Sequence, residues 1–131
     1  MAITLSQVEP GIYFSLWEED VSYEDMIAAR HEAARVPKEN GDDTFVLIYE
    51  FKDVRVPEFN FGNFNLSAMR NLMNQTSHIV YEHVIFMNLS AGARMAISTY
   101  HKLFKGLGRN DYYVKSFDEA VIKARSILEK A

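Results

Sequence analysis

Two polar segments of the sequence carry side chains suited to binding a ligand or a partner, and each follows a run of β-prone residues. The first is Lys52-Asp53-Val54-Arg55, and the second contains Asn88, Ser90 and Arg94. Ligands of open α/β sheets bind beyond the carboxyl ends of the strands, where the strand order reverses. The second segment would also place backbone N–H groups, a hydroxyl and a guanidinium at a helix start, which suits an anion. An ordinary N-cap serine beside a solvated arginine gives the same pattern, so both interpretations stay open.

Aromatic residues gather in the connection between these segments: Phe59, Phe61 and Phe64. They could form an exposed recognition patch or a lid over a pocket, or they could fold back as a small buried cluster. Met69 and Met73 follow at helical spacing. Methionine there usually fills gaps in a core, but beside these aromatic residues it would also suit an adaptable binding surface. The sequence predicts that the surface for a protein partner or a second copy runs from Lys52 to Met73. A ligand pocket would lie instead between the Phe59–Phe64 loop and a helix that begins near Gly92.

The residue patterns typical of catalysis or metal binding do not occur in the sequence. There is no cysteine, and the four histidines do not have the spacing of a metal-binding pair on a helix. A nucleophile–base pair of Ser90 with His101 stays open, but no G-x-S-x-G turn surrounds a serine to support it. Gly106-Leu107-Gly108 follows a predicted helix rather than a strand, so it indicates a helix end and not a phosphate-binding loop. We expect no catalytic residue, no metal and no cofactor, and a protein that is not an enzyme.

Composition narrows the class of protein further. The 131 residues predict one domain, residues 1–131, and the 48% hydrophobic and 24% charged content is that of a globular chain. A net charge of −4 without a basic block argues against a nucleic-acid partner. The lack of cysteine suits a reducing compartment, and no apolar stretch approaches the ~20 residues of a membrane span. Because the N-terminus shows no signal sequence, we expect a soluble cytoplasmic protein without a membrane span.

Runs of β-prone residues predict five strands. The first two flank the turn Glu9-Pro10-Gly11 and should form an N-terminal hairpin. The third is continuously β-prone, as expected of a strand buried on both faces, and the fifth is short and should lie near an edge. The predicted strands cover Ile3–Val8, Ile12–Trp17, Thr44–Phe51, a part of Val80–Leu89, and Tyr112–Val114.

Helical spacing of apolar residues predicts four helices between and after these strands. The segments Ser22-Tyr23-Glu24-Asp25 and Ser116-Phe117-Asp118-Glu119 have the form of capping boxes and should start the first and last helices. Pro37 and Asn40-Gly41 should end the first helix, and Lys52–Phe64 should form an irregular connection. The two middle helices should run from near Asn65 to Asn74–Ser77 and over Gly92–Lys105.

The element order is therefore ββαβαβαβα. Strand–helix–strand units impose parallel pairing with right-handed crossovers, and the leading hairpin adds an antiparallel strand. The acidic groups Glu18-Glu19-Asp20 and Asp42-Asp43 are attributed to solvated turns. The sequence predicts an α/β protein with one mixed sheet of about five strands, covered by about four helices.

This order of elements resembles the STAS domain (sulfate transporter and anti-sigma-factor antagonist), in particular its SpoIIAA-like branch. The resemblance covers nearly the whole chain. Two local segments carry it: the strand Phe45–Phe51 followed by Lys52-Asp53-Val54, and the strand-to-helix junction Tyr113–Ala120. In the family the first segment leads into the functional loop. The resemblance implies a STAS-like fold and a regulatory module that binds proteins or senses ligands.

One motif of the family is missing. Regulatory STAS domains carry Asp-Ser-x-Gly at the start of the helix after this strand, and phosphorylation of its serine switches binding to a kinase partner. Here the region reads Asn63-Phe64-Asn65-Leu66-Ser67-Ala68-Met69, so we do not transfer phosphorylation to Ser67. We expect a non-enzymatic STAS-like module that binds a protein partner, or itself as a homodimer. The alternative is a domain that binds a lipid or an acidic metabolite, with Arg55 and Arg94 meeting its head group.

Overall fold

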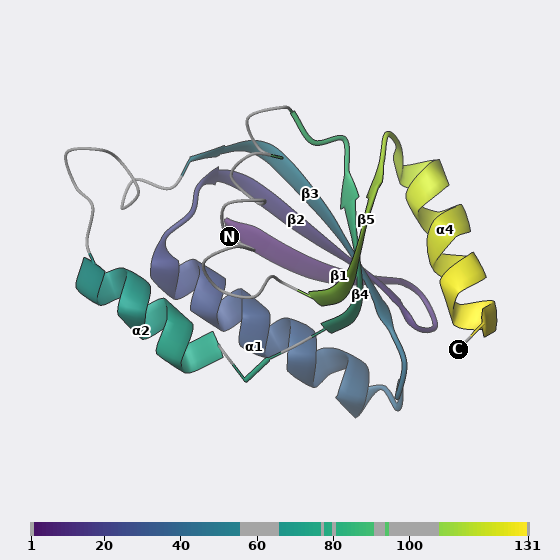
Figure 1. Ribbon diagram of the computed structural model, residues 1–131, viewed down its shortest axis with the longest axis horizontal. Coiled ribbons are helices and arrows are strands. Elements are labelled where there is room, and N and C mark those ends of the chain that lie inside the picture. The colour runs from purple at the N-terminus through teal and green to yellow at the C-terminus, as the bar shows by residue number, and fades with distance from the viewer. Residues whose placement is uncertain are drawn as a thin grey trace.

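The computed structural model of this chain describes residues 2–55, 66–76, 78–79, 81–90, 94 and 108–130. Within them the predicted mixed α/β fold is confirmed, with one five-stranded sheet and three helices (Figure 1). The predicted helix Gly92–Lys105 lies outside the described residues except at Arg94, which is helical. The elements in chain order are β1 (Ile3–Glu9), β2 (Ile12–Asp20), α1 (Tyr23–Glu39), β3 (Val46–Arg55), α2 (Leu66–Thr76), β4 (Tyr81–Met87), β5 (Gly108–Val114) and α4 (Phe117–Lys130).

The strands stand in the sheet in the order in which they occur in the chain, β1-β2-β3-β4-β5. β1 and β2 form the predicted antiparallel hairpin, whose turn contains Gly11 at φ +81°, and the other pairs are parallel. β5 lies at an edge, as predicted. The order does not reverse anywhere among these five strands, so the expected crevice at a reversal point is not found in them.

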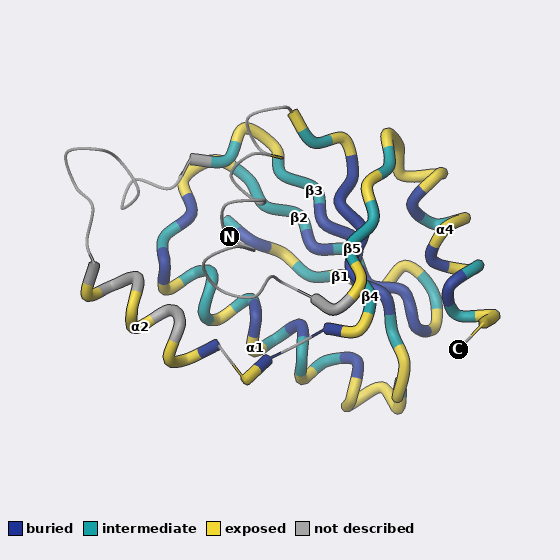
Figure 2. The backbone as a smooth tube through the Cα atoms, in the orientation of Figure 1, coloured by how far each residue is buried: buried dark blue, intermediate teal, exposed yellow. Residues whose placement is uncertain are grey.

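Helices cover both faces of the sheet, and alternate strand residues supply a core on each face. α1 lies over one face with α2 packed against it, and α4 covers the opposite face (Figure 1). Leu47 and Phe86 pack with Ala33 of α1, whereas Ile48 packs with Ala124 of α4. Figure 2 shows the buried positions along the strands and on the inner sides of α1 and α4. None of the helices in the described ranges is long and apolar enough to cross a membrane.

Both predicted capping boxes start helices. At α1 the Ser22 hydroxyl accepts a hydrogen bond from the Asp25 N–H at 3.0 Å, and the Asp25 carboxylate accepts one from the Ser22 N–H at 2.9 Å. At α4 the Ser116 hydroxyl accepts from the Glu119 N–H at 3.2 Å, but the Glu119 carboxylate accepts from Lys115 rather than from Ser116. The side chains therefore satisfy N–H groups that the first turn of a helix leaves unpaired.

The end of α1 corrects one prediction, because the helix continues through Pro37 to Glu39. The missing N–H of Pro37 removes only one bond near the end of the helix, and its carbonyl accepts a hydrogen bond from the Asp42 N–H at 2.9 Å. Gly41, at φ +81°, supplies the left-handed residue that this closure needs. Asn40-Gly41 thus ends the helix as predicted, and Pro37 does not.

Four strands extend beyond their predicted bounds, β1 only by Glu9. β2 continues to Asp20, so Glu18–Asp20 belong to a strand and not to a turn. β3 continues to Arg55, so the first part of the predicted irregular connection is paired, and β5 begins at Gly108, which was expected to end a helix. These extensions are mostly polar residues held by pairing with a neighbouring strand. Such strand ends lack the apolar periodicity that reveals a strand in sequence.

Arg30 is a charged side chain inside the core, at 5% exposure on α1. Its Nη2 donates a hydrogen bond to the Ile79 carbonyl at 2.8 Å, and its guanidinium carbon lies 5.2 Å from the centre of the Tyr81 ring. The Tyr81 hydroxyl in turn donates to the Arg30 carbonyl at 3.0 Å. Arg30 therefore fastens α1 to the start of β4, although its buried Nε and Nη1 have no hydrogen-bond partner in the described chain.

Candidate functional site at the carboxyl edge of the sheet

The carboxyl ends of β2, β3, β4 and β5 meet at one edge of the sheet because these strands are parallel. The register places Lys52 beside Glu18, and it places Met87 between Glu50 and Val114. The structure therefore brings the two predicted polar segments to the same edge. The described residues of this carboxyl-edge surface are Glu18, Glu19, Asp20, Lys52, Asp53, Asn88, Ser90 and Arg94; Glu18 is half-buried and the others are exposed.

The backbone at this edge is left-handed at three neighbouring positions. Glu19 in β2 has φ +56°, Asp53 in β3 has φ +52°, and Asn88 just after β4 has φ +52°. Asparagine and aspartate tolerate this conformation, whereas glutamate adopts it less readily. At Asp53 the register between β2 and β3 shifts, and β3 carries the extra residue. Glu19 is therefore the strained position of the three, and strained backbone of this kind often lies at functional sites.

Arg94 is held at the carboxyl edge by an aromatic ring. Its guanidinium carbon lies 4.5 Å from the centre of the Tyr113 ring, and the backbone N–H of Arg94 donates a hydrogen bond to the Ser90 carbonyl at 2.9 Å. Burial and the nearby Asp111 carboxylate raise the pKa of Tyr113, although Arg94 acts in the opposite direction. The phenol therefore stays uncharged at neutral pH. The edge thus presents an oriented cation beside an exposed serine, which can receive an acidic group.

A row of aromatic rings supports the same edge from the α1 face of the sheet. Phe86 stacks on Tyr49 with ring centres 5.6 Å apart and on Tyr113 at 5.5 Å, and Trp17 meets Phe51 edge-on at 5.1 Å. Tyr49 and Phe86 are buried, whereas Tyr113 is 41% exposed at the end of the row. The row crosses β2 to β5, and its packing fixes the strand ends from which the polar side chains emerge.

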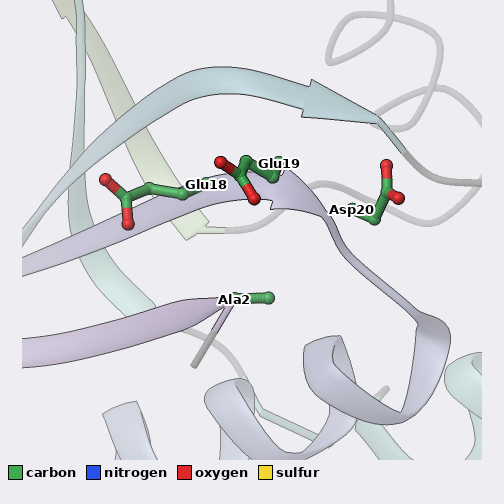
Figure 3. A pocket seen from close by; sticks show the side chains of 4 residues that line it. All are labelled: Ala2, Glu18, Glu19 and Asp20. Atoms are coloured by element: carbon green, nitrogen blue, oxygen red, sulfur yellow. The ribbon is translucent and has the colours of Figure 1, made fainter.

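The acidic end of β2 lines a shallow hollow together with Ala2 (Figure 3). The backbone N–H of Glu18 donates to the Ala2 carbonyl at 2.8 Å, which holds the start of β1 against β2. Figure 3 shows the carboxylates of Glu18 and Asp20 on opposite sides of Glu19, so the three do not converge on one point. Across the described ranges no group of three or more His, Asp or Glu side chains could hold a metal ion.

The remaining predicted site residues belong to the segment that ends in α2. Ser67 is exposed on α2. The backbones of Arg55, Met69 and Met73 lie in β3 and α2, but their side chains are outside the described part of the structure. Phe59, Phe61 and Phe64 also lie outside the described residues, so the aromatic recognition patch stays a prediction.

α2 carries the second part of the surface that the sequence predicted from Lys52 to Met73. The helix packs against α1, and its described side chains other than Thr76 are exposed and polar. Its sequence, LSAMRNLMNQT, contains an arginine and no acidic residue in a chain of net charge −4. Its arginine and amides were not named from the sequence, although they form a visible polar run within an amphipathic helix. The exposed residues of this α2 surface are Ser67, Arg70, Asn71, Asn74 and Gln75.

Comparison with known proteins identifies the fold. No family model matches the chain, and no curated protein is detectably similar to it in sequence. A similar solved structure is that of SpoIIAA, a cell fate determinant of Bacillus, in its phosphorylated form. The two chains are 11% identical and superpose with a TM-score of 0.51 over 93% of this chain and 98% of SpoIIAA. This chain therefore has a SpoIIAA-like fold, which confirms the resemblance to the STAS domain at the level of fold.

Proposed function

We propose that this chain is a non-enzymatic, STAS-type regulatory module that binds a protein partner. The SpoIIAA-like fold carries the proposal, because it extends over 93% of this chain and 98% of the cell fate determinant that it resembles. The binding surface is formed by the end of β3, at Lys52 and Asp53, and by the α2 surface. Both flank the connection that leads to the functional loop in the family that the sequence resembles.

The chemistry of the α2 surface supports a polar, reversible interface. Arg70 is a cation flanked by the amides of Asn71 and Asn74, which can each donate and accept hydrogen bonds. Lys52 adds a second exposed cation at the end of β3. Surfaces of this kind suit transient signalling contacts, which are smaller and wetter than permanent interfaces. The partner should therefore present acidic and amide groups.

The test places a photoreactive benzoylphenylalanine in place of Asn71 and irradiates cells that naturally make the protein. The control places the same group in place of Ile122, which is 66% exposed on α4 at the opposite face of the sheet. We expect one protein to be captured from α2 and not from α4, and Arg70→Glu to remove that adduct. Equal labelling from both positions, or an adduct insensitive to Arg70→Glu, would refute the assignment of this surface.

A second candidate function is the binding of a small acidic ligand, favoured by the Arg94 guanidinium fixed over the Tyr113 ring at 4.5 Å. Ligand that binds the folded chain raises its melting temperature in proportion to the logarithm of its excess over Kd. The test screens fatty acids, nucleotides and acidic metabolites for such a rise, then repeats the screen with Arg94→Ala. A rise that Arg94→Ala removes supports this function, and no rise with any compound contradicts it.

A further inference from the structure

The two edges of the sheet are protected to different degrees. β5, at one edge, carries Arg109 and Asp111 within its seven residues. β1, at the other edge, contains no charged residue and no proline from Ile3 to Val8. Natural sheets usually guard an exposed edge with lysine, proline, a bulge or a covering element. The register of β1 shifts only after Gln7, so the preceding residues form a regular strand. α1 packs against β1, but none of the hydrogen bonds of the described chain engages the outer side of this strand.

The hydrogen-bonding pattern shows which backbone groups β1 leaves open. The Glu18 N–H donates to the Ala2 carbonyl at 2.8 Å, so these two residues form a hydrogen-bonded pair of the antiparallel ladder. Such pairs alternate along the strand, so Thr4 and Ser6 also bond to β2. The N–H and C=O groups of the alternating residues point away from β2 and meet no partner in the described chain: Ile3, Leu5 and Gln7.

We propose that β1 pairs antiparallel with β1 of a second copy of this chain, which joins two sheets into one. Centred on Leu5, the pairing places Leu5 beside Leu5 of the second copy. Ile3 then lies beside Gln7 of the second copy, and the open N–H and C=O groups of these residues bond to one another. Thr4 lies opposite Ser6 of the second copy, a pair that is favourable across strands. Both side chains point to the same side of the sheet as α4, where they are exposed.

The distribution of charge favours a second copy of this chain as the partner that pairs with the open edge of β1. Two copies of a chain of net charge −4 repel each other wherever like charges meet. β1 avoids this because Ile3–Val8 is uncharged and Glu9 is already paired with Arg125, with N–O distances of 2.6 and 3.2 Å. The same pairing through β5 would centre on Asp111 and oppose two carboxylates. β1 is therefore the edge at which two identical strands meet without repulsion.

The test measures the mass of the full-length protein by sedimentation equilibrium from low micromolar to several hundred micromolar. For the wild type we expect a rise from 15.1 kDa toward twice that mass with concentration. One double variant carries Thr4→Lys and Ser6→Lys, and a second carries Thr4→Glu and Ser6→Glu. Each alone should stay at the monomer mass, because like charges oppose each other across the pair. Their mixture should form a heterodimer, because opposite charges then meet.

The controls separate this interface from other effects of the substitutions. Asn71→Lys with Gln75→Lys makes the same change of charge on α2 and should leave self-association intact. Gln7→Pro removes one outward N–H without adding charge, so it should also weaken self-association. This variant tests the interface if the lysine variants fold poorly. A wild type that stays at 15.1 kDa throughout, or a dimer that neither charged variant disrupts, overturns the proposal. Neither result bears on partner binding at α2, which the crosslinking experiment tests separately.

Discussion

Replacing Tyr13 with phenylalanine isolates one partly buried polar contact that joins β2 to the end of α1. The Tyr13 hydroxyl donates a hydrogen bond to the Asp42 carboxylate and accepts one from Asn40 Nδ2 at 3.0 Å. Asn40 and Asp42 reach it because the left-handed Gly41 between them closes the helix. Tyr13 itself is fully buried, so Tyr13→Phe keeps the ring packing and removes only the hydroxyl.

The structure sets the size of the effect. A hydrogen bond to a charged group contributes about 1.5–3 kcal/mol to stability. Part of this loss is offset in the variant because water can bind the released Asn40 and Asp42 side chains. We expect Tyr13→Phe to lower the free energy of unfolding by about 1–2 kcal/mol. At this chain length such a loss lowers Tm by roughly 4–8 °C.

The measurement is urea unfolding at pH 7, followed by circular dichroism. Tyr113→Phe is the matched control, because its ring is 41% exposed and removal of its hydroxyl should cost less than about 0.5 kcal/mol. A double-mutant cycle of Tyr13→Phe with Asp42→Ala should give a coupling free energy of at least about 1 kcal/mol. A coupling near zero, or a Tyr13→Phe variant as stable as the wild type, would refute the assignment of this contact.

The same contact predicts a dependence on alkaline pH. Burial and the hydrogen bond to Asp42 raise the pKa of Tyr13 above its ordinary value of about 10. Below pH 10 the phenol is protonated in both the folded and unfolded chains, so its contribution is fully present. Above that pH the unfolded chain loses the proton first, and stability falls as pH rises through the folded pKa. The difference in stability between wild type and Tyr13→Phe should therefore narrow above pH 10, and a constant difference contradicts the reasoning.

Three further substitutions test local features by the same unfolding assay. Ser22→Ala removes the capping bond to Asp25 and should cost about 1 kcal/mol, whereas a cost near zero would show that water replaces the cap. Gly41→Ala should cost about 1–2 kcal/mol from its left-handed backbone alone, because no atom lies within 4 Å of the added carbon; an unchanged stability would contradict this. Arg30→Met removes a buried, partly unsatisfied charge and should leave stability within about 1 kcal/mol of wild type or above it. A loss above about 3 kcal/mol would mean that its bond to Ile79 outweighs the burial of the charge.

The order of elements could be predicted from the sequence because it depends on local signals. Ser22 and Ser116 start helices through bonds to residues three positions ahead, and the β-prone run around Ile48 is buried on both faces. Such features depend only on residues that are close together in the sequence. The boundary errors at Asp20 and Arg55 have the opposite cause. Those polar residues are strand because they pair with each other, and pairing between distant segments leaves no local trace.

The candidate site was predicted in part for the same reason. Carboxyl ends of parallel strands must meet, so Lys52 and Asn88 could be placed at one edge before the fold was known. The left-handed backbone at Glu19 and the contact of Arg94 with Tyr113 could not, since both depend on how β2 and β5 end relative to their neighbours. The buried charge of Arg30 was also missed, because its partner carbonyl belongs to a distant residue.

The two proposed interfaces occupy different parts of the fold, and this has a consequence for binding strength. β1 is separated from β3 by β2, so a pair of chains joined through β1 would leave the ends of β3 and β4 free on both copies. Such a dimer would present two partner surfaces and bind a clustered partner with an avidity above the affinity of one site. Thr4→Lys with Ser6→Lys should then weaken binding to a partner displayed densely on a surface, but leave the Kd for a single soluble partner unchanged. Equal weakening in both formats would mean instead that the β1 edge itself contacts the partner.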